Sequence, residues 1–234
     1  LYYIVIFLNI YIYQMCYSFE SSIKTSLMSF ASVLYLYTSG IDKFKWLAST
    51  LIGWSIMQFA EALLWLTKPS ISCTNINRIL TLTLIPLVLM SQSLGSLFGS
   101  FYSYPWNKLT TNYKLIYIIY TLIVVAIILY SQFGNIQNTC TTVTPSGHLD
   151  WSTNKSDVAF GITSSQSITI ITIIIGLPLI LLWKNKSELI ALFIIPILSA
   201  YYGLSTDSPL SIWCYFTSFS SIIFALKLYL HKLG

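Results

Sequence analysis

Apolar residues in this chain gather into runs of about twenty, and short polar stretches that carry most of the charge separate these runs. The clearest run covers residues 46–66, in which Gln58 and Glu61 are the strongly polar positions. At a rise of about 1.5 Å per residue, a helix of this length covers roughly 31 Å, which matches the hydrocarbon thickness of a bilayer. The run therefore predicts a membrane-spanning helix with one acid inside it.

Six other apolar runs follow the same pattern, so the sequence predicts an all-α membrane protein, a seven-transmembrane-helix bundle. The expected helices cover residues 17–37, 46–66, 79–102, 114–132, 159–183, 188–204 and 210–229. The longest connection, residues 133–158, is polar, and we expect it to form a loop that is too polar to be buried.

Residues 1–14 are apolar but short for a span, and they lack the basic region and small-residue cleavage site of a signal peptide. The first methionine is Met15, directly before the first predicted helix. We therefore expect Met15 to be the natural start, residues 1–14 to be a non-native upstream segment or leader, and residues 15–234 to form a single seven-helix domain.

Composition supports the membrane assignment, because 56% of the residues are hydrophobic and 8% are charged, against about a quarter charged in a soluble domain. The net charge of +5 comes from basic residues that are spread singly between helices, a distribution that argues against nucleic acid as a partner. Of the two histidines, His148 is expected outside and His231 inside. A multi-histidine zinc site or a Ser-His dyad within the bilayer is thus excluded, and we expect no enzymatic activity, cofactor or metal.

The distribution of lysine and arginine predicts the orientation, because short cytoplasmic loops are enriched in both. The connections after the first, third and fifth helices, together with the tail, hold eight basic residues, and the opposite connections hold three. We therefore expect the N-terminus outside and the C-terminus in the cytoplasm. The eight are Lys43, Lys45, Lys108, Lys114, Lys184, Lys186, Lys227 and Lys232, and the three are Lys68, Arg78 and Lys155.

The cysteines fit the same topology. Cys73 and Cys140 lie in connections that share the outer face, and Cys16 and Cys214 lie near the outer ends of the first and last helices. An oxidising outer compartment permits disulfides, and four cysteines allow three pairings. We expect a Cys73–Cys140 disulfide because both residues lie in outer loops; free thiols are the alternative.

Polar side chains inside the predicted spans are the candidates for function. An acid at the centre of a membrane helix costs about 2.5–3.5 kcal/mol on insertion scales, so such residues face a partner or water. The candidate intramembrane polar site comprises Gln58, Glu61, Gln92, Glu20 and Lys24. Glu20 and Lys24 are four residues apart and can pair locally, which makes Glu61 the sharper candidate. Alternatively, Glu61 is protonated or bonded by Gln92, Lys24 or a hydroxyl of the last helix, and only holds helices together.

Small residues recur at every fourth position in the third helix, at Ser91, Gly95 and Gly99. This spacing lets helices approach closely and indicates a packing seam. The last helix carries hydroxyls that either line a wet vestibule or bond to carbonyls of their own helix. These are Thr217, Ser218, Ser220 and Ser221.

Four short segments, at residues 15–20, 57–65, 147–151 and 211–214, carry a resemblance to known proteins: MCYSFE, MQFAEALLW, GHLDW and SIWC. On these segments the chain resembles an uncharacterised family of multi-spanning proteins from large, AT-rich DNA viruses of protists. That family begins at a Met-Cys-aromatic-Ser-x-Glu motif, so the resemblance implies that Met15 is the start. It implies no established activity and assigns no functional residue.

Two functional hypotheses follow, and in both the lipid bilayer is the surrounding partner. In the first, the protein transports a small solute or an ion through a polar cavity around Glu61. In the second, it is a receptor-like or scaffolding protein that binds a partner or ligand through disulfide-braced outer loops.

Overall fold

The computed structural model describes residues 18–133, 140–151, 177–178, 180–182 and 209–233. Long helices dominate these residues: α2 (Phe19–Tyr37), α3 (Asp42–Leu66), α4 (Asn75–Gly99), α5 (Thr111–Phe133) and α8 (Pro209–Leu233). The shorter elements are two 3₁₀ turns, η1 (Ser100–Tyr102) and η2 (Trp106–Lys108), and two strands, β1 (Thr142–Val143) and β2 (Leu149–Asp150).

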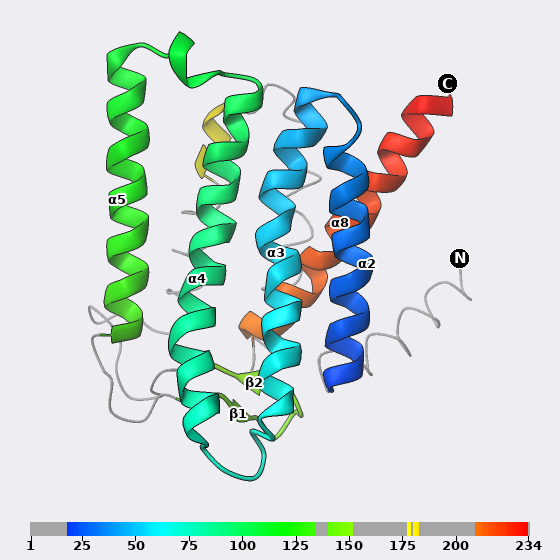
Figure 1. Cartoon of the computed structure of the whole chain (residues 1–234), viewed down its shortest axis with the longest axis vertical. Coiled ribbons are helices and arrows are strands. Elements are labelled where there is room, and N and C mark those ends of the chain that lie inside the picture. Colours follow the sequence, from blue (N-terminus) through cyan, green and yellow to red (C-terminus); the bar gives the residue numbers. More distant parts are fainter. Residues whose placement is uncertain (1–17, 134–139, 152–176, 179, 183–208, 234) are drawn as a thin grey trace.

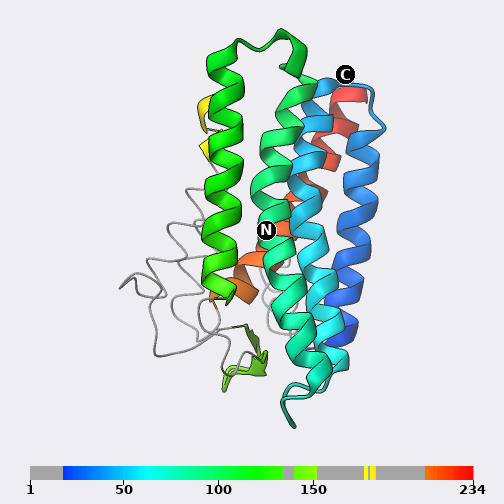
Figure 2. The same ribbon diagram turned by 60° about the vertical axis from the view of Figure 1, so that its left-hand side comes forward.

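Helices α2 to α5 lie side by side in chain order and alternate in direction, while α8 crosses behind α2 and α3 (Figure 1). Figure 2 shows the same layer from another side, with α8 against its far face. The α2–α3 and α4–α5 connections lie at the same end as the C-terminus, whereas the α3–α4 connection and the two strands lie at the other end (Figure 1). We call the first the basic end, because Lys43 and Lys45 lie at the start of α3. We call the other the disulfide end, because it holds the Cys73–Cys140 disulfide.

Three helical segments are long and apolar enough to cross a membrane: Asp42–Leu66, Asn75–Tyr102 and Thr111–Leu129. This confirms helices of membrane-crossing length and polarity at three of the seven predicted positions. The predicted helices at 159–183 and 188–204 lie outside the described residues, apart from 177–178 and 180–182, which are helical. Residues 1–14 also lie outside them.

Helices α3, α4 and α5 begin three or four residues before the predicted apolar runs, because polar residues form their first turns. Helix α2 begins two residues after its predicted start. Helix α3 begins at Asp42, whose carboxylate is stabilised by the partial positive charge at the helix N-terminus. The same carboxylate lies 3.7 Å from Lys45 Nζ. Helix α4 begins at Asn75, after Thr74 accepts a hydrogen bond from the backbone N–H of Asn77. The helices therefore include residues that the sequence pattern assigned to the 38–45 and 67–78 connections.

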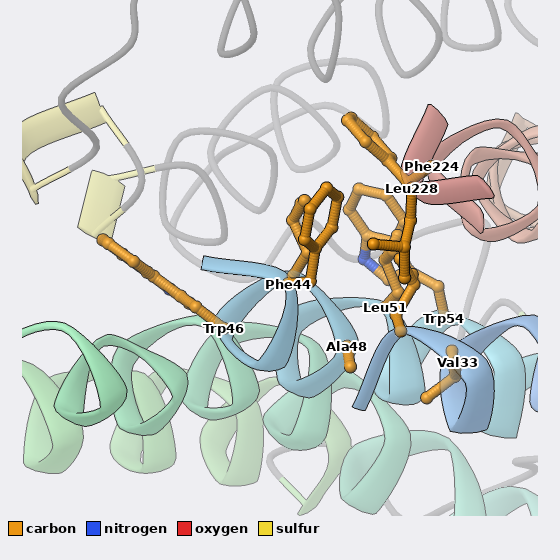
Figure 3. Close-up of a cluster of buried hydrophobic side chains, with 10 residues drawn as sticks. Val33, Phe44, Trp46, Ala48, Leu51, Trp54, Phe224 and Leu228 are labelled. Carbon is orange, nitrogen blue, oxygen red and sulfur yellow. The ribbon is translucent and has the colours of Figure 1, made fainter. Parts of the chain in front are cut away.

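One hydrophobic core joins α2, α3 and α8. Figure 3 shows Phe224 and Leu228 of α8 lying over Leu51 and Trp54 of α3. All four side chains are at most 4% exposed. This core holds α8 against the four-helix layer.

A second hydrophobic core joins α3, α4, α5 and the strand segment. Its fully buried members include Met57, Leu64 and Ile85, together with Leu149 and Trp151 at 1% and 4% exposure. The strand segment thus contributes to the core although its composition is polar.

Helices α3 and α4 approach so closely that glycine is required at their contact. A Cβ at Gly53 would lie 2.6 Å from the backbone nitrogen of Gln92, and one at Gly95 would clash with the carbonyl oxygen of Ser49. A Cβ at Gly99 would lie 2.8 Å from Trp46 Cδ1. Gly95 and Gly99 therefore lie on the face that packs against α3, and Gly53 is a matching position on α3 that the sequence pattern did not indicate.

The polar connection at residues 133–158 was wrongly expected to be unburied throughout. Strands β1 and β2 pair antiparallel, with Thr142 opposite Asp150 and Val143 opposite Leu149. Gly147 completes the turn with a φ of +84°, a conformation that favours glycine. This hairpin packs onto the bundle because the side chains of Leu149 and Trp151 are apolar and buried. Its turn is also closed by backbone hydrogen bonds between Thr144 and His148 and between Gly147 and Thr144.

Candidate functional site

The polar site in α3 is built on Glu61, whose side chain is completely buried. Gln58 is also completely buried, and its Nε2 donates to Glu61 Oε2 at 3.1 Å. The two residues are three apart, so one turn of helix brings them together. Glu61 lies five residues before the end of α3, about 7.5 Å along the helix axis from the disulfide end.

Gln92 of α4 is also buried, but it lies at a different height along α3 from the Gln58–Glu61 pair. Its backbone packs at Gly53, which precedes Gln58 by five residues, a rise of about 7.5 Å. Within the described part of the chain, Nε2 of Gln92 is buried without a hydrogen-bond partner. A buried amide donor in this state costs about 1–3 kcal/mol. Because Gln92 packs against Gly53, it adds a buried polar group near the middle of α3.

A layer of serine hydroxyls continues the polar face toward α2 and α8. Ser29 of α2 hydrogen-bonds through Oγ to Ser55 of α3 and, at 2.8 Å, to Ser221 of α8. Ser26 donates to the carbonyl of Ser55 at 3.3 Å. Because Ser55 precedes Gln58 by three residues, the hydroxyl layer lies one helical turn from the Gln58–Glu61 pair.

The α2 part of this layer was not among the sequence predictions. Ser22, Ser26 and Ser29 are all completely buried, and their spacing of four and three residues places them on one helix face. That spacing was the sequence signal from which a buried serine face on α2 could have been predicted. Of the α8 hydroxyls named above, Ser220 and Ser221 are buried, whereas the side chains of Thr217 and Ser218 lie outside the described residues.

Glu20 and Lys24 do not belong to the buried site. They pair with each other, with Lys24 Nζ 3.8 Å from Glu20 Oε2, and their side chains are 79% and 71% exposed, respectively. Both residues lie on the exposed side of α2. Ser22, which lies between them in sequence, and Ser26, which follows Lys24, are completely buried. The predicted local pairing of Glu20 with Lys24 is therefore confirmed, and the pair lies on the exposed side of α2, whereas Glu61 and Gln58 are completely buried.

The disulfide end holds the second group of candidate residues. Cys73 and Cys140 form the expected disulfide, with their Cα atoms 5.7 Å apart. The bond links the α3–α4 connection to the segment that leads into β1. Cys16 and the side chain of Cys214 lie outside the described residues.

Asn77 fixes the same segment through its amide. Nδ2 donates to the carbonyl of Thr141 at 3.0 Å, and Oδ1 accepts from the backbone N–H of Thr141 at 2.9 Å. Nδ2 also donates to Thr67 Oγ1 at 2.9 Å, and the hydroxyls of Thr81 and Thr141 lie 2.8 Å apart. One buried side chain thus joins the end of α3, the start of α4 and the hairpin segment.

His148 lies in the turn that follows this segment and is 7% exposed. Its backbone N–H donates to Thr144 Oγ1, and its carbonyl accepts from the backbone N–H of Thr144 at 2.8 Å. Burial holds the pKa of the His148 imidazole below its usual value, because desolvation disfavours the charged ring. The folded hairpin therefore favours neutral His148.

We expect acidification to weaken the hairpin. Since the pKa of His148 is lower in the folded state, the unfolded segment binds the extra proton first, and stability falls as pH drops below about 6.5. Amide hydrogen exchange of the hairpin at pH 7 and pH 5 measures this effect. His148→Gln should remove the pH dependence, whereas His231→Gln, in the exposed last turn of α8, should retain it; equal responses of both variants would contradict the prediction.

No group of three or more His, Cys, Asp or Glu side chains that could hold a metal ion occurs among the described residues. Comparison with protein-family models, curated proteins and solved structures finds no match to this chain.

Proposed function

We propose that this chain is a multi-pass integral membrane protein that transports a small solute or an ion along the buried polar face of α3. Glu61 is the proton or cation site in this proposal. The observation that carries it is a completely buried carboxyl group in a helix long enough to span a bilayer. Ionisable residues in such positions are costly and typically mark pathways for ions or substrates.

The surroundings of Glu61 support a binding role. Gln58 supplies one hydrogen bond, and the serine layer of α2, α3 and α8 provides further polar atoms one turn away. Hydroxyl and amide oxygens of this kind can take the place of water molecules around a bound cation or hydronium ion. A chain of them beside an acid is the kind of lining that a transport route requires.

The test is ion flux into liposomes that contain the purified full chain, with protons, sodium and potassium as probes. Glu61→Gln preserves the shape of the side chain and still offers an oxygen to Gln58, but it cannot bind a proton. We expect it to reduce flux to the level of protein-free liposomes. Glu20→Gln is the matched control, because it removes an exposed carboxylate and should leave flux unchanged. Equal flux in wild type and Glu61→Gln would refute the proposed role.

The proposal includes seven spans, with the N-terminus outside and the C-terminus in the cytoplasm. It is supported by the described basic residues Lys43, Lys45, Lys108, Lys114, Lys227 and Lys232, which lie in or next to the start of α3, the start of α5 and the last turns of α8. These helix ends lie at one end of the layer (Figure 1). The Cys73–Cys140 disulfide lies at the opposite end. Protease protection of a tag placed after Gly234, in sealed vesicles, tests the orientation.

A second candidate function is favoured by the disulfide end. The hairpin is fixed by Cys73–Cys140 and by the Asn77 amide, and this bracing suits a receptor-like or scaffolding protein that presents a rigid outer surface. In that case Glu61 serves only to hold helices together. Flux would then be absent from wild type, and ligand or partner binding would depend on the disulfide.

A further inference from the structure

An apolar groove of about 800 Å³ runs along α3 between α2 and α4. Its lining includes the small residues Ala48, Gly95 and Gly99, which leave space for it, and the larger side chains of Leu34 and Phe98. Leu34 and Phe98 are 63% and 48% exposed. The volume falls within the range of roughly 300–1,000 Å³ that is usual for ligand sites.

The groove is polar and basic at one end only. Tyr102 and Tyr37, which both line it, share a hydrogen bond in which the Tyr102 hydroxyl donates to the Tyr37 hydroxyl at 2.8 Å. Lys45 Nζ lies 5.7 Å from the centre of the Tyr102 ring. Lys45 Nζ lies 3.7 Å from Asp42 Oδ1, and the side chains of Lys45 and Asp42 are 28% and 62% exposed. Because Asp42 is largely in contact with solvent, this ion pair is weak and offsets the lysine charge only in part.

The charge at this end is strongly unbalanced. Among the described residues at or near the helix ends that form the basic end, Asp42 is the acid, whereas the lysines are Lys43, Lys45, Lys108, Lys114, Lys227 and Lys232. Each lysine near a membrane surface attracts anionic lipid by about 1 kcal/mol. The groove therefore combines an apolar channel with a cationic, hydroxyl-lined mouth.

We propose that this groove binds an acyl chain of an anionic phospholipid, whose charged headgroup lies at Lys45 and the Tyr37–Tyr102 hydroxyls. The inference rests on insertion of α2, α3 and α4 in a membrane and requires no role for Glu61. A second copy of the chain fits less well, because a copy in the same membrane orientation would bring Lys43 and Lys45 beside their own counterparts. A zwitterionic lipid gains less from the same lysines.

Native mass spectrometry of the full chain, purified in detergent with equal amounts of phosphatidylglycerol and phosphatidylcholine, tests the site. We expect wild type to retain phosphatidylglycerol preferentially. Lys45→Gln should lower this preference about five-fold, which corresponds to about 1 kcal/mol for one lysine. Lys68→Gln removes an exposed lysine beyond the other end of α3 and should leave the preference unchanged.

A steric pair of variants tests the apolar channel. Leu34→Trp places a larger ring in the groove and should abolish retention of the lipid. Leu27→Trp is the matched control on the same helix, because Leu27 is 62% exposed and lies outside the groove lining. Both substitutions are at exposed positions, so circular dichroism should show folded protein.

Three results would overturn the lipid site: equal retention of the two lipids by wild type, unchanged retention in Leu34→Trp, or equal losses in Lys45→Gln and Lys68→Gln. A dimer that Leu34→Trp dissociates, without bound lipid, would assign the groove to a second copy instead. Glu61→Gln should retain lipid as wild type does. Failure of the transport proposal and failure of the lipid site are therefore distinguishable.

Discussion

Asn77→Ala is expected to destabilise the protein by about 3 kcal/mol, although the substitution removes only a few atoms. It deletes the hydrogen bonds from Asn77 to both backbone groups of Thr141 and to the Thr67 hydroxyl. The carbonyl of Thr141 then loses the partner described for it, and an unsatisfied buried group costs about 1–3 kcal/mol. The N–H of Thr141 keeps a weaker contact to Thr81 Oγ1, at 3.2 Å.

The measurement is the urea unfolding midpoint in detergent micelles, together with hydrogen exchange at the amides of Thr141 and Val143. Asn75→Ala is the matched control, because Asn75 lies two residues earlier on α4 and is exposed. Its effect should stay within about 0.5 kcal/mol. If the two variants unfold at the same midpoint, the Asn77 amide does not hold the hairpin.

Cys73→Ser should produce the other large loss of stability, because it opens a covalent loop of 67 residues. The chain-entropy relation gives about 4 kcal/mol for a loop of this length. This value is an upper bound for a membrane protein, since insertion already restricts the unfolded chain. The unfolding midpoint of wild type with and without a reducing agent measures the same quantity, and Cys73→Ser should be insensitive to that agent.

The disulfide and the Asn77 amide hold neighbouring residues, Cys140 and Thr141, so their effects should not add. In a double-mutant cycle, we expect Asn77→Ala to cost a different amount in the Cys73→Ser background, with a coupling of about 0.5–3 kcal/mol. Strict additivity would mean that the two links stabilise separate parts of the fold. The same variants also test the second candidate function, because loss of partner binding in Cys73→Ser, together with absence of flux in wild type, would favour it.

The long apolar helices were predictable from sequence because their length and polarity follow from local composition. The runs at 46–66, 79–102 and 114–132 predicted α3, α4 and α5, and errors fell at their ends, where Asp42 and Asn75 continue the helices. The predicted disulfide followed from topology alone. These features depend on neighbours in sequence or on the side of the membrane, not on detailed packing.

Features that depend on distant pairs were missed. The hairpin is buried because Asn77 pairs with Thr141 across 64 residues, and polar composition gave no sign of that partnership. Gly53 was missed because a single glycine lacks the repeated spacing of Gly95 and Gly99. The interval of four residues predicted the pairing of Glu20 with Lys24 correctly, but such an interval does not show which side of α2 the pair occupies.

The contrast between two helix contacts has a mechanical consequence. Between α3 and α4, backbone atoms meet at Gly53 and Gly95, and the Asn77 amide ties the adjoining helix ends, so these helices and the hairpin should move as one rigid body. Between α2 and its neighbours α3 and α8, serine hydroxyls meet instead, and hydroxyls exchange partners with small rotations. Any rearrangement should therefore slide α2 across a stationary α3–α4 pair.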